Sequence, residues 1–184
     1  MRDDLPALLA VDLDAAFPLL VESHQHMLYG LALRMLRNRE EAEEVAQDAL
    51  VRAYRALARY EADRIRELRL RAWLARVCVN LCRNRMRRAR PWSSELDDQL
   101  HASRDEAPDA FAERVAGSGE WARRLDALPS RQRAAVLLRH VAGLSYEELA
   151  LALARPVGTV KADVHRGLRT LRTALAAEEL EAVK

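Results

Sequence analysis

The sequence lacks the features that mark secreted, membrane-spanning and redox-stapled proteins. Its 184 residues include only two cysteines, and no apolar run approaches the roughly 20 residues that a membrane span needs. The N-terminus is acidic at Asp3, Asp4, Asp12 and Asp14, whereas a signal peptide begins with basic residues and continues with an apolar run. We therefore expect a cytoplasmic chain without membrane insertion.

Motifs that carry catalysis are also missing. The sequence contains no HExxH, no glycine-rich phosphate loop, no ExxH di-iron pair and no nucleophile elbow. Cys78 and Cys82 lie four residues apart on a predicted helix, which does not suit a disulfide, and no histidine stands at ligand spacing. They are either buried small side chains or a CxxxC metal or redox site. We favour the first interpretation, and expect no enzymatic activity, no metal and no cofactor.

Basic and acidic residues nearly balance over the whole chain, but they are concentrated in different segments. There are 30 Lys and Arg residues against 28 Asp and Glu residues, so the net charge of +2 indicates nothing about nucleic acid. Between Arg64 and Arg90, however, ten arginines face a single acid, Glu67. Such segregation is typical of a nucleic-acid-binding surface.

Apolar spacing of three and four residues predicts an all-α protein made of two small helical domains. Helices are expected over residues 14–36, from Asn38 to about residue 59, and over about 70–88. Residues 60–70 lose this periodicity and are expected to form a loop. Residues 91–119 are rich in acids, Ser, Pro and Gly, which predicts a flexible linker, with a short helix near 108–115. The predicted domains are 1–90 and 120–184, the second opening with a helix over 120–127.

The segment Leu128–Leu175 predicts a helix-turn-helix. Pro129-Ser130 opens a first helix that Gly143 can end, and Ser145 with Glu148 forms a capping box for a second helix. Arg155-Pro156 breaks that helix, and a third begins at Val157. Its apolar stripe is expected to be buried and consists of Val157, Val160, Val164, Leu168, Leu171 and Leu175.

The opposite face of the third helix suits a DNA major groove, although a solvated face on a helical bundle is the alternative. It holds Thr159, Ala162, Arg166 and Arg169, with Asp163 beside them and Lys161 and His165 on a flank.

This segment resembles the −35-recognising domain of bacterial sigma factors, most of all the two-domain extracytoplasmic-function group. The elements LP-RQR, LLR, GLSYEELA, P-VGTVK and HR-L-LR stand in the family's order. Ala154 stands where the family usually has glycine, and Ala162-Asp163 replace a serine-arginine pair. Asp163 therefore either weakens contacts with phosphates or is neutralised by Arg166.

The first domain carries two further resemblances. AEEVAQDALVRAY is similar to the family motif that grips the clamp helices of the polymerase's largest subunit, which implies core-polymerase contacts through Glu43, Glu44, Gln47 and Asp48. An ordinary acidic first turn, favoured by the helix dipole, is the alternative. WLARVCVN resembles the −10-reading helix of the family, in which the loop before this helix captures an unstacked base. The resemblance implies −10 contacts through Arg64, Arg66, Arg69, Arg76, Asn80, Arg83 and Arg87, while Trp73 is a core residue or a melting wedge.

Together these resemblances imply an alternative sigma factor without covalent chemistry. Its expected partners are core RNA polymerase, through the clamp helices and the flap, promoter DNA and an anti-sigma factor. The alternative is an autonomous regulator of the response-regulator-output type, which would explain residues 128–175 but would leave the acidic face and the arginine block without a role.

Overall fold

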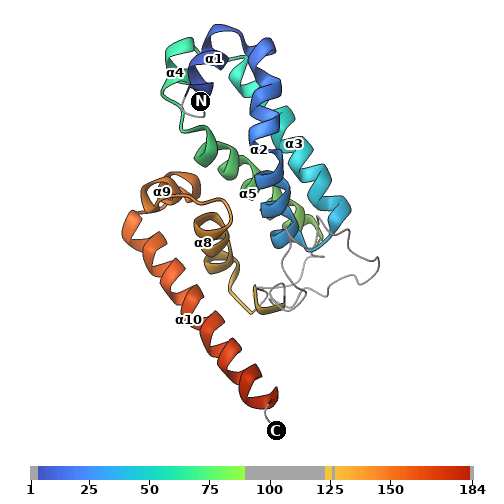
Figure 1. Cartoon of the computed structure of the whole chain (residues 1–184), viewed down its shortest axis with the longest axis vertical. Coiled ribbons are helices and arrows are strands. Elements are labelled where there is room, and N and C mark those ends of the chain that lie inside the picture. The colour runs from blue at the N-terminus through green and yellow to red at the C-terminus, as the bar shows by residue number, and fades with distance from the viewer. Residues whose placement is uncertain (1–3, 90–122, 126, 183–184) are drawn as a thin grey trace.

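All regular elements in the described part of the chain are helices (Figure 1). The computed structural model describes residues 4–89, 123–125 and 127–182. The predicted linker and the helix near 108–115 lie outside these ranges, and so does half of the predicted helix 120–127, of which residues 123–125 are helical. None of the described helices is both long enough and apolar enough to cross a membrane.

The N-terminal helices form one packed unit. They are α1 (Leu5–Val11), α2 (Leu13–Leu36), α3 (Arg39–Leu57), α4 (Ala62–Arg66) and α5 (Leu70–Ala89). The Asp12 carboxylate accepts a hydrogen bond from the Ala15 amide at 3.0 Å and caps the N-terminus of α2. The Asn38 side chain accepts a hydrogen bond from the Glu41 amide at 3.0 Å and caps the N-terminus of α3, as predicted from the sequence.

Residues 60–70 depart from the predicted loop. They contain the five-residue helix α4, which packs against α1 and buries Ile65. The element is too short to show helical periodicity, and Ile65 is its only large apolar residue. Neither the helix nor its partner α1, which has seven residues, was predicted from the sequence.

Helix α5 is packed on two sides. It lies against α2 and α3 within the N-terminal unit and against α9 of the C-terminal unit (Figure 1). Cys78 and Cys82 are both free and fully buried, and the Cys78 thiol donates to the Leu28 carbonyl at 3.5 Å. The interpretation of the two cysteines as buried small side chains is confirmed.

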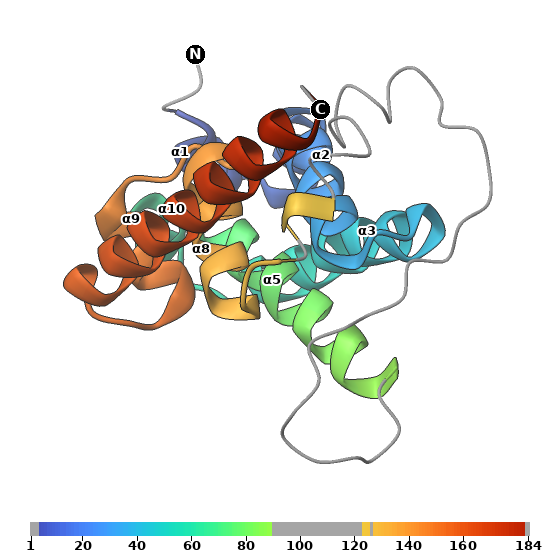
Figure 2. The same ribbon diagram turned by 90° about the horizontal axis from the view of Figure 1, so that it is seen from below.

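The C-terminal helices form the predicted helix-turn-helix. They are α8 (Ser130–His140), α9 (Tyr146–Leu153) and α10 (Val157–Ala182). The capping box is present: the Glu148 amide donates to the Ser145 hydroxyl at 3.2 Å, and the Ser145 amide donates to the Glu148 carboxylate at 2.8 Å. In Figure 2, α10 runs across α8 and α9, both of which it contacts.

Three turns in the described residues have left-handed backbone: Arg37 ends α2 with φ 58°, and the other two are at Gly143 and Ala154. Gly143 has φ +65°, and a Cβ there would meet the Arg71 guanidinium of α5 at 3.3 Å, so glycine serves both the turn and the close approach of the two units. Ala154 has φ 52° at the end of α9, where it adopts a conformation that glycine reaches at lower cost.

The apolar back of α10 packs on α8, but only half of the stripe expected to be buried is fully so, since Leu168 and Leu175 are half-buried. Val160, Val164 and Leu171 are buried, whereas Val157 is 41% exposed because the first residue of the helix precedes the contact with the core. Gly167 permits close approach, since a Cβ at this position would lie 2.7 Å from the Val136 side chain.

We expect Gly167→Ala to lower the free energy of unfolding by about 1–3 kcal/mol, because the new methyl group overpacks a rigid valine. Gly158→Ala on the same helix is the matched control, because nothing lies within 4 Å of its Cβ. That variant should gain up to about 1 kcal/mol from helix propensity. Urea unfolding followed by circular dichroism measures both, and a Gly167→Ala protein as stable as the wild type would contradict this packing.

Candidate nucleic-acid interface

The predicted acidic face lies on α3 and is open to solvent. Glu43, Glu44, Gln47 and Asp48 are all exposed, while the opposite side of α3 is buried through Ala42, Val45, Ala46, Ala49, Ala53 and Leu57. Three of the four residues border a groove of 480 Å³ between α3 and α5, whose floor includes Leu81. The sequence therefore placed these side chains on one accessible surface.

The carboxylates of this face are already paired with arginines. Glu43 pairs with Arg39 at 3.4 Å and Asp48 with Arg52 at 3.2 Å, both one helical turn away. Glu44 pairs with Arg85 of α5 across the groove. Sequence reasoning missed Arg85, because its partner lies 41 positions away and no local pattern connects them.

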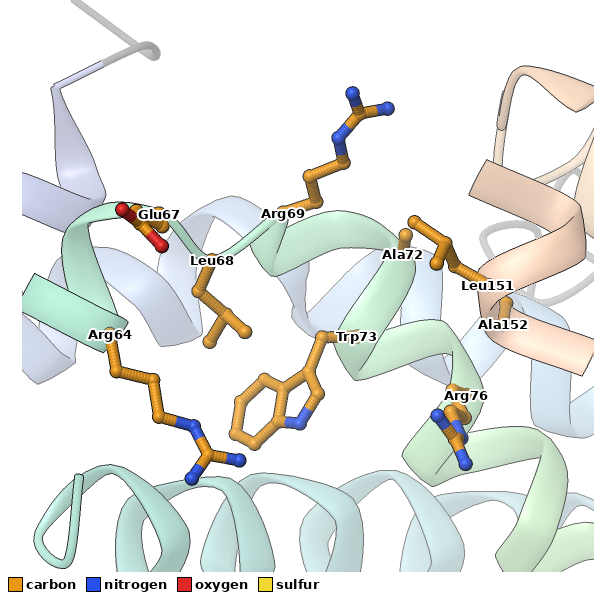
Figure 3. Close-up of a pocket in the computed structure, with 9 residues that line it drawn as sticks. All are labelled: Arg64, Glu67, Leu68, Arg69, Ala72, Trp73, Arg76, Leu151 and Ala152. Carbon is orange, nitrogen blue, oxygen red and sulfur yellow. The ribbon is translucent and has the colours of Figure 1, made fainter. Parts of the chain in front are cut away.

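A cavity of 360 Å³ lies where α4 leads into α5 (Figure 3). Leu68 and Trp73 point into it, Arg64 and Arg76 stand at its border, and Arg69 points away from it. The Arg64 guanidinium stacks 3.8 Å from the centre of the Tyr60 ring, and Tyr60 in turn packs 6.2 Å from the Trp73 ring. Trp73 is half-buried, so it is both a core residue and a wall of the cavity.

Helix α9 supplies a wall of the same cavity. Leu151, 57% exposed, and Ala152 face Ala72 across the space between the two units (Figure 3). Sequence reasoning did not find this contribution, since the contact joins residues about 80 positions apart that belong to different units.

The predicted polar stripe of α5 is only partly exposed to solvent. Arg76, Asn80 and Arg87 are exposed, whereas Arg83 is half-buried. Burial lowers the pKa of the Arg83 guanidinium, and the positive charges of Arg155 and Arg131 lower it further. This stripe therefore runs beside cationic groups of the C-terminal unit.

Of the remaining basic residues predicted to contact −10 DNA, Arg64 and Arg69 line the same cavity as Arg76. Arg64, Arg66 and Arg69 are exposed, and Arg66 pairs with Asp63 at 2.6 Å.

The face of α10 predicted to meet DNA is exposed at most positions. The exposed members are Thr159, Lys161, His165, Arg166 and Arg169, and Ala162 is half-buried. The Lys161 ammonium lies 5.9 Å from the centre of the Tyr146 ring, and the Arg139 guanidinium lies 5.2 Å from the same point. Tyr146 was not predicted as part of the surface.

Asp163 lies elsewhere than the sequence suggested. It is 5% exposed and is paired with Arg166 at 2.8 Å and with Arg155 at 2.9 Å. The alternative in which Arg166 neutralises Asp163 is thus confirmed, and the carboxylate is not presented to solvent beside the other residues. Arg155 was not predicted, because it belongs to the turn and not to the third helix.

Among the described residues, no group of three or more His, Cys, Asp or Glu side chains is arranged to share a metal ion. The site therefore consists of exposed cations, an exposed acidic face and a partly apolar cavity. Exposed charged surfaces of this kind suit contacts with charged macromolecules.

Two family models match the sequence. Sigma-70 region 2 covers residues 20–91, and Sigma-70, region 4 covers residues 118–171. The first range includes α3 and α5, and the second includes α8, α9 and the first half of α10.

Sequence similarity to known sigma factors covers most of the chain. The sequence is 34% identical over 170 residues to the RNA polymerase sigma-H factor of Pseudomonas aeruginosa, covering 87% of this chain and 86% of that protein. It is 34% identical over 162 residues to the ECF RNA polymerase sigma-E factor of Escherichia coli, covering 82% of each, and 31% identical over 173 residues to SigW of Bacillus subtilis, covering 87% and 89%. The chain belongs to the extracytoplasmic-function group of the sigma-70 family.

Solved structures agree with this assignment. CnrH in complex with the cytosolic domain of CnrY has a TM-score of 0.68 and 25% identity, covering 95% of this chain and 97% of that one. The sigma factor RpoE of Bartonella quintana, in complex with the anti-sigma factor NepR, has a TM-score of 0.65 at 22% identity, which shows a shared fold.

As a member of this family, the protein is a non-enzymatic initiation factor that directs RNA polymerase to promoters. The autonomous-regulator alternative is set aside, because it gives no role to the region 2 match over residues 20–91.

Proposed function

We propose that this sigma factor divides its task among three surfaces: the acidic face of α3 docks on core polymerase, α5 with its cavity holds melted −10 DNA, and α10 reads the −35 duplex. The observation that carries the proposal is the cavity at residues 64–76, which combines an aromatic wall with a positive rim next to the exposed stripe of α5. The proposed units are residues 1–90 and 120–184, joined by 91–119.

The cavity suits a base removed from its stack. Its 360 Å³ falls in the range of about 300–1,000 Å³ found for small-molecule sites. Trp73 and Leu68 supply apolar surface for the base, and Arg64 and Arg76 supply cations for the adjoining phosphates. Contacts of this kind offset the few kcal/mol that unstacking costs, and so shift the duplex toward the open form.

Because Leu151 and Ala152 wall the cavity from the side of α9, a DNA strand that follows the stripe of α5 meets the helix-turn-helix. We infer that α9 separates from α5 when −10 DNA binds. The mutual repulsion of Arg83, Arg131 and Arg155 would favour that separation, because it opposes the contact between the two units.

Two surfaces suit the polymerase. The exposed carboxylates of α3 can exchange their arginine partners on the same chain for basic side chains of the clamp helices. A second groove of 520 Å³ lies between α8 and α10 and is lined mainly by leucine and valine, including Val136, Leu168 and Leu171. This groove suits an apolar element such as the flap.

The proposed setting is the cytoplasm, where core polymerase acts. The solved relatives bound to CnrY and to NepR support an anti-sigma factor as a further partner.

Run-off transcription with purified core enzyme over genomic fragments tests the proposed function as a whole. We expect the wild-type chain to confer initiation at discrete start sites that core enzyme alone does not use. Failure to join core enzyme and to initiate anywhere, with no inhibitor present, would refute it.

We expect Glu44→Arg with Asp48→Arg to weaken binding to core polymerase by about 100-fold or more, because like charges at an interface cost several kcal/mol. Fluorescence anisotropy of labelled sigma factor titrated with core enzyme measures this affinity. The matched control is Asp4→Arg with Glu22→Arg, which makes the same charge change at exposed positions of the same unit. Equal loss in the control would mean that net charge alone sets the affinity, and unchanged binding of the first variant would contradict docking by α3.

We expect Trp73→Ala to reduce open-complex formation about tenfold, because stacking on an aromatic side chain is worth about 1–3 kcal/mol per base. Permanganate reactivity of −10 thymines measures opening, and anisotropy shows whether core binding persists. Trp73→Phe is the control, since it keeps an aromatic wall and should retain most of the opening. Wild-type opening by a folded Trp73→Ala protein would remove the cavity from the mechanism.

A further inference from the structure

Asp163 is the only buried charged residue in the described part of the chain, at 5% exposure. It lies in the second turn of α10, the helix whose exposed face is proposed to read DNA. A buried carboxylate is costly unless its oxygens are satisfied. Its environment therefore has to supply a reason for its presence.

Each carboxylate oxygen of Asp163 accepts a hydrogen bond from one guanidinium. Arg166 Nη2 donates to Oδ1 at 2.8 Å, and Arg155 Nη1 donates to Oδ2 at 2.9 Å. Arg166 belongs to α10 itself, whereas Arg155 belongs to the turn between α9 and α10. One carboxylate thus fixes two cations from different elements next to each other.

Both arginines remain accessible to a ligand. The Arg166 side chain is 56% exposed and the Arg155 side chain 27%, against 8% for Asp163. A guanidinium has five N–H donors, so the bond to Asp163 occupies only part of its capacity. The carboxylate is buried, whereas the Arg166 side chain is exposed and the Arg155 side chain is partly exposed.

The two arginines would not stay together without that carboxylate. They carry like charges, and Arg155 also lies close enough to Arg83 for its charge to lower the pKa of that guanidinium. A purely apolar side chain at position 163 could fill the volume but could not hold either arginine.

We propose that Asp163 is a positioning residue for −35 recognition, which does not touch DNA but fixes Arg155 and Arg166 as a pair at the start of α10. The inference rests on the proposed role of α10. It has a distinctive consequence: replacing the carboxylate by an amide removes one negative charge and releases both arginines from their ion pairs. Affinity for arbitrary DNA should then hold or rise, while discrimination between sequences falls.

Binding selections from a DNA pool with random −35 positions test this proposal. Holoenzyme made from the full chain and core enzyme is used, and bound DNA is sequenced. With Asp163→Asn we expect preference at one or more positions to fall about tenfold, the scale of a lost bidentate base contact. Affinity for a fixed non-promoter duplex should be unchanged or higher. Glu178→Gln is the matched control, because it removes one negative charge from the same helix and should leave the preference intact.

Arg155→Gln and Arg166→Gln provide a second readout that does not depend on how well position 163 tolerates change. If the arginines act as a pair, each single variant and the double variant should lose preference at the same positions and to a similar extent. Adding Asp163→Asn to the double variant should then change nothing further.

The outcomes separate the possible failures. No enrichment by the wild-type holoenzyme would overturn the proposed function of α10, and this inference with it. Enrichment by the wild type with the same preference in Asp163→Asn would overturn the inference alone. So would equal losses on specific and arbitrary DNA, which indicate a structural role, or losses in the double arginine variant that equal the product of the single losses.

Discussion

Helix α5 packs against other helices on two of its faces, and the rest of the structure depends on this packing. One side closes the N-terminal core with α2 and α3, and another receives α9. The side chains of α5 that remain exposed to solvent are polar: Arg71, Arg76, Asn80, Asn84, Arg87 and Arg88. The same helix therefore sets the core, the cavity at its first turn and the contact with the helix-turn-helix, and a shift of α5 would disturb all three.

Charge on this molecule is organised in pairs that can be exchanged. The acidic face of α3 is held by Arg85, Arg52 and Arg39, all on exposed surfaces where an ion pair is worth about 0–1 kcal/mol. Such pairs keep the side chains extended and cost little to break when a partner supplies its own cations. The pair at Asp163 differs because its carboxylate is buried, so it is suited to hold a geometry and not to release one.

Local features of the fold could be predicted from the sequence, and long-range ones could not. The caps at Asn38 and Ser145 and the turn at Gly143 follow from chemistry within a few residues, and the structure has all three. Helix α4 was missed because five residues show no period. The pairing of Arg85 with Glu44, the α9 wall of the cavity and the burial of Asp163 depend on how separate elements meet, which no local pattern encodes.

The two thiols of α5 bear on what this factor can sense. Cys78 and Cys82 are fully buried, and the interaction with the neighbouring Cys82 thiol, together with burial, raises the pKa of the Cys78 thiol. Oxidants attack the thiolate, and a protonated, enclosed sulfur offers them neither charge nor access. Cys78 is therefore a poor target for peroxide, and oxidation at this position would first require α5 to separate from the helices packed against it.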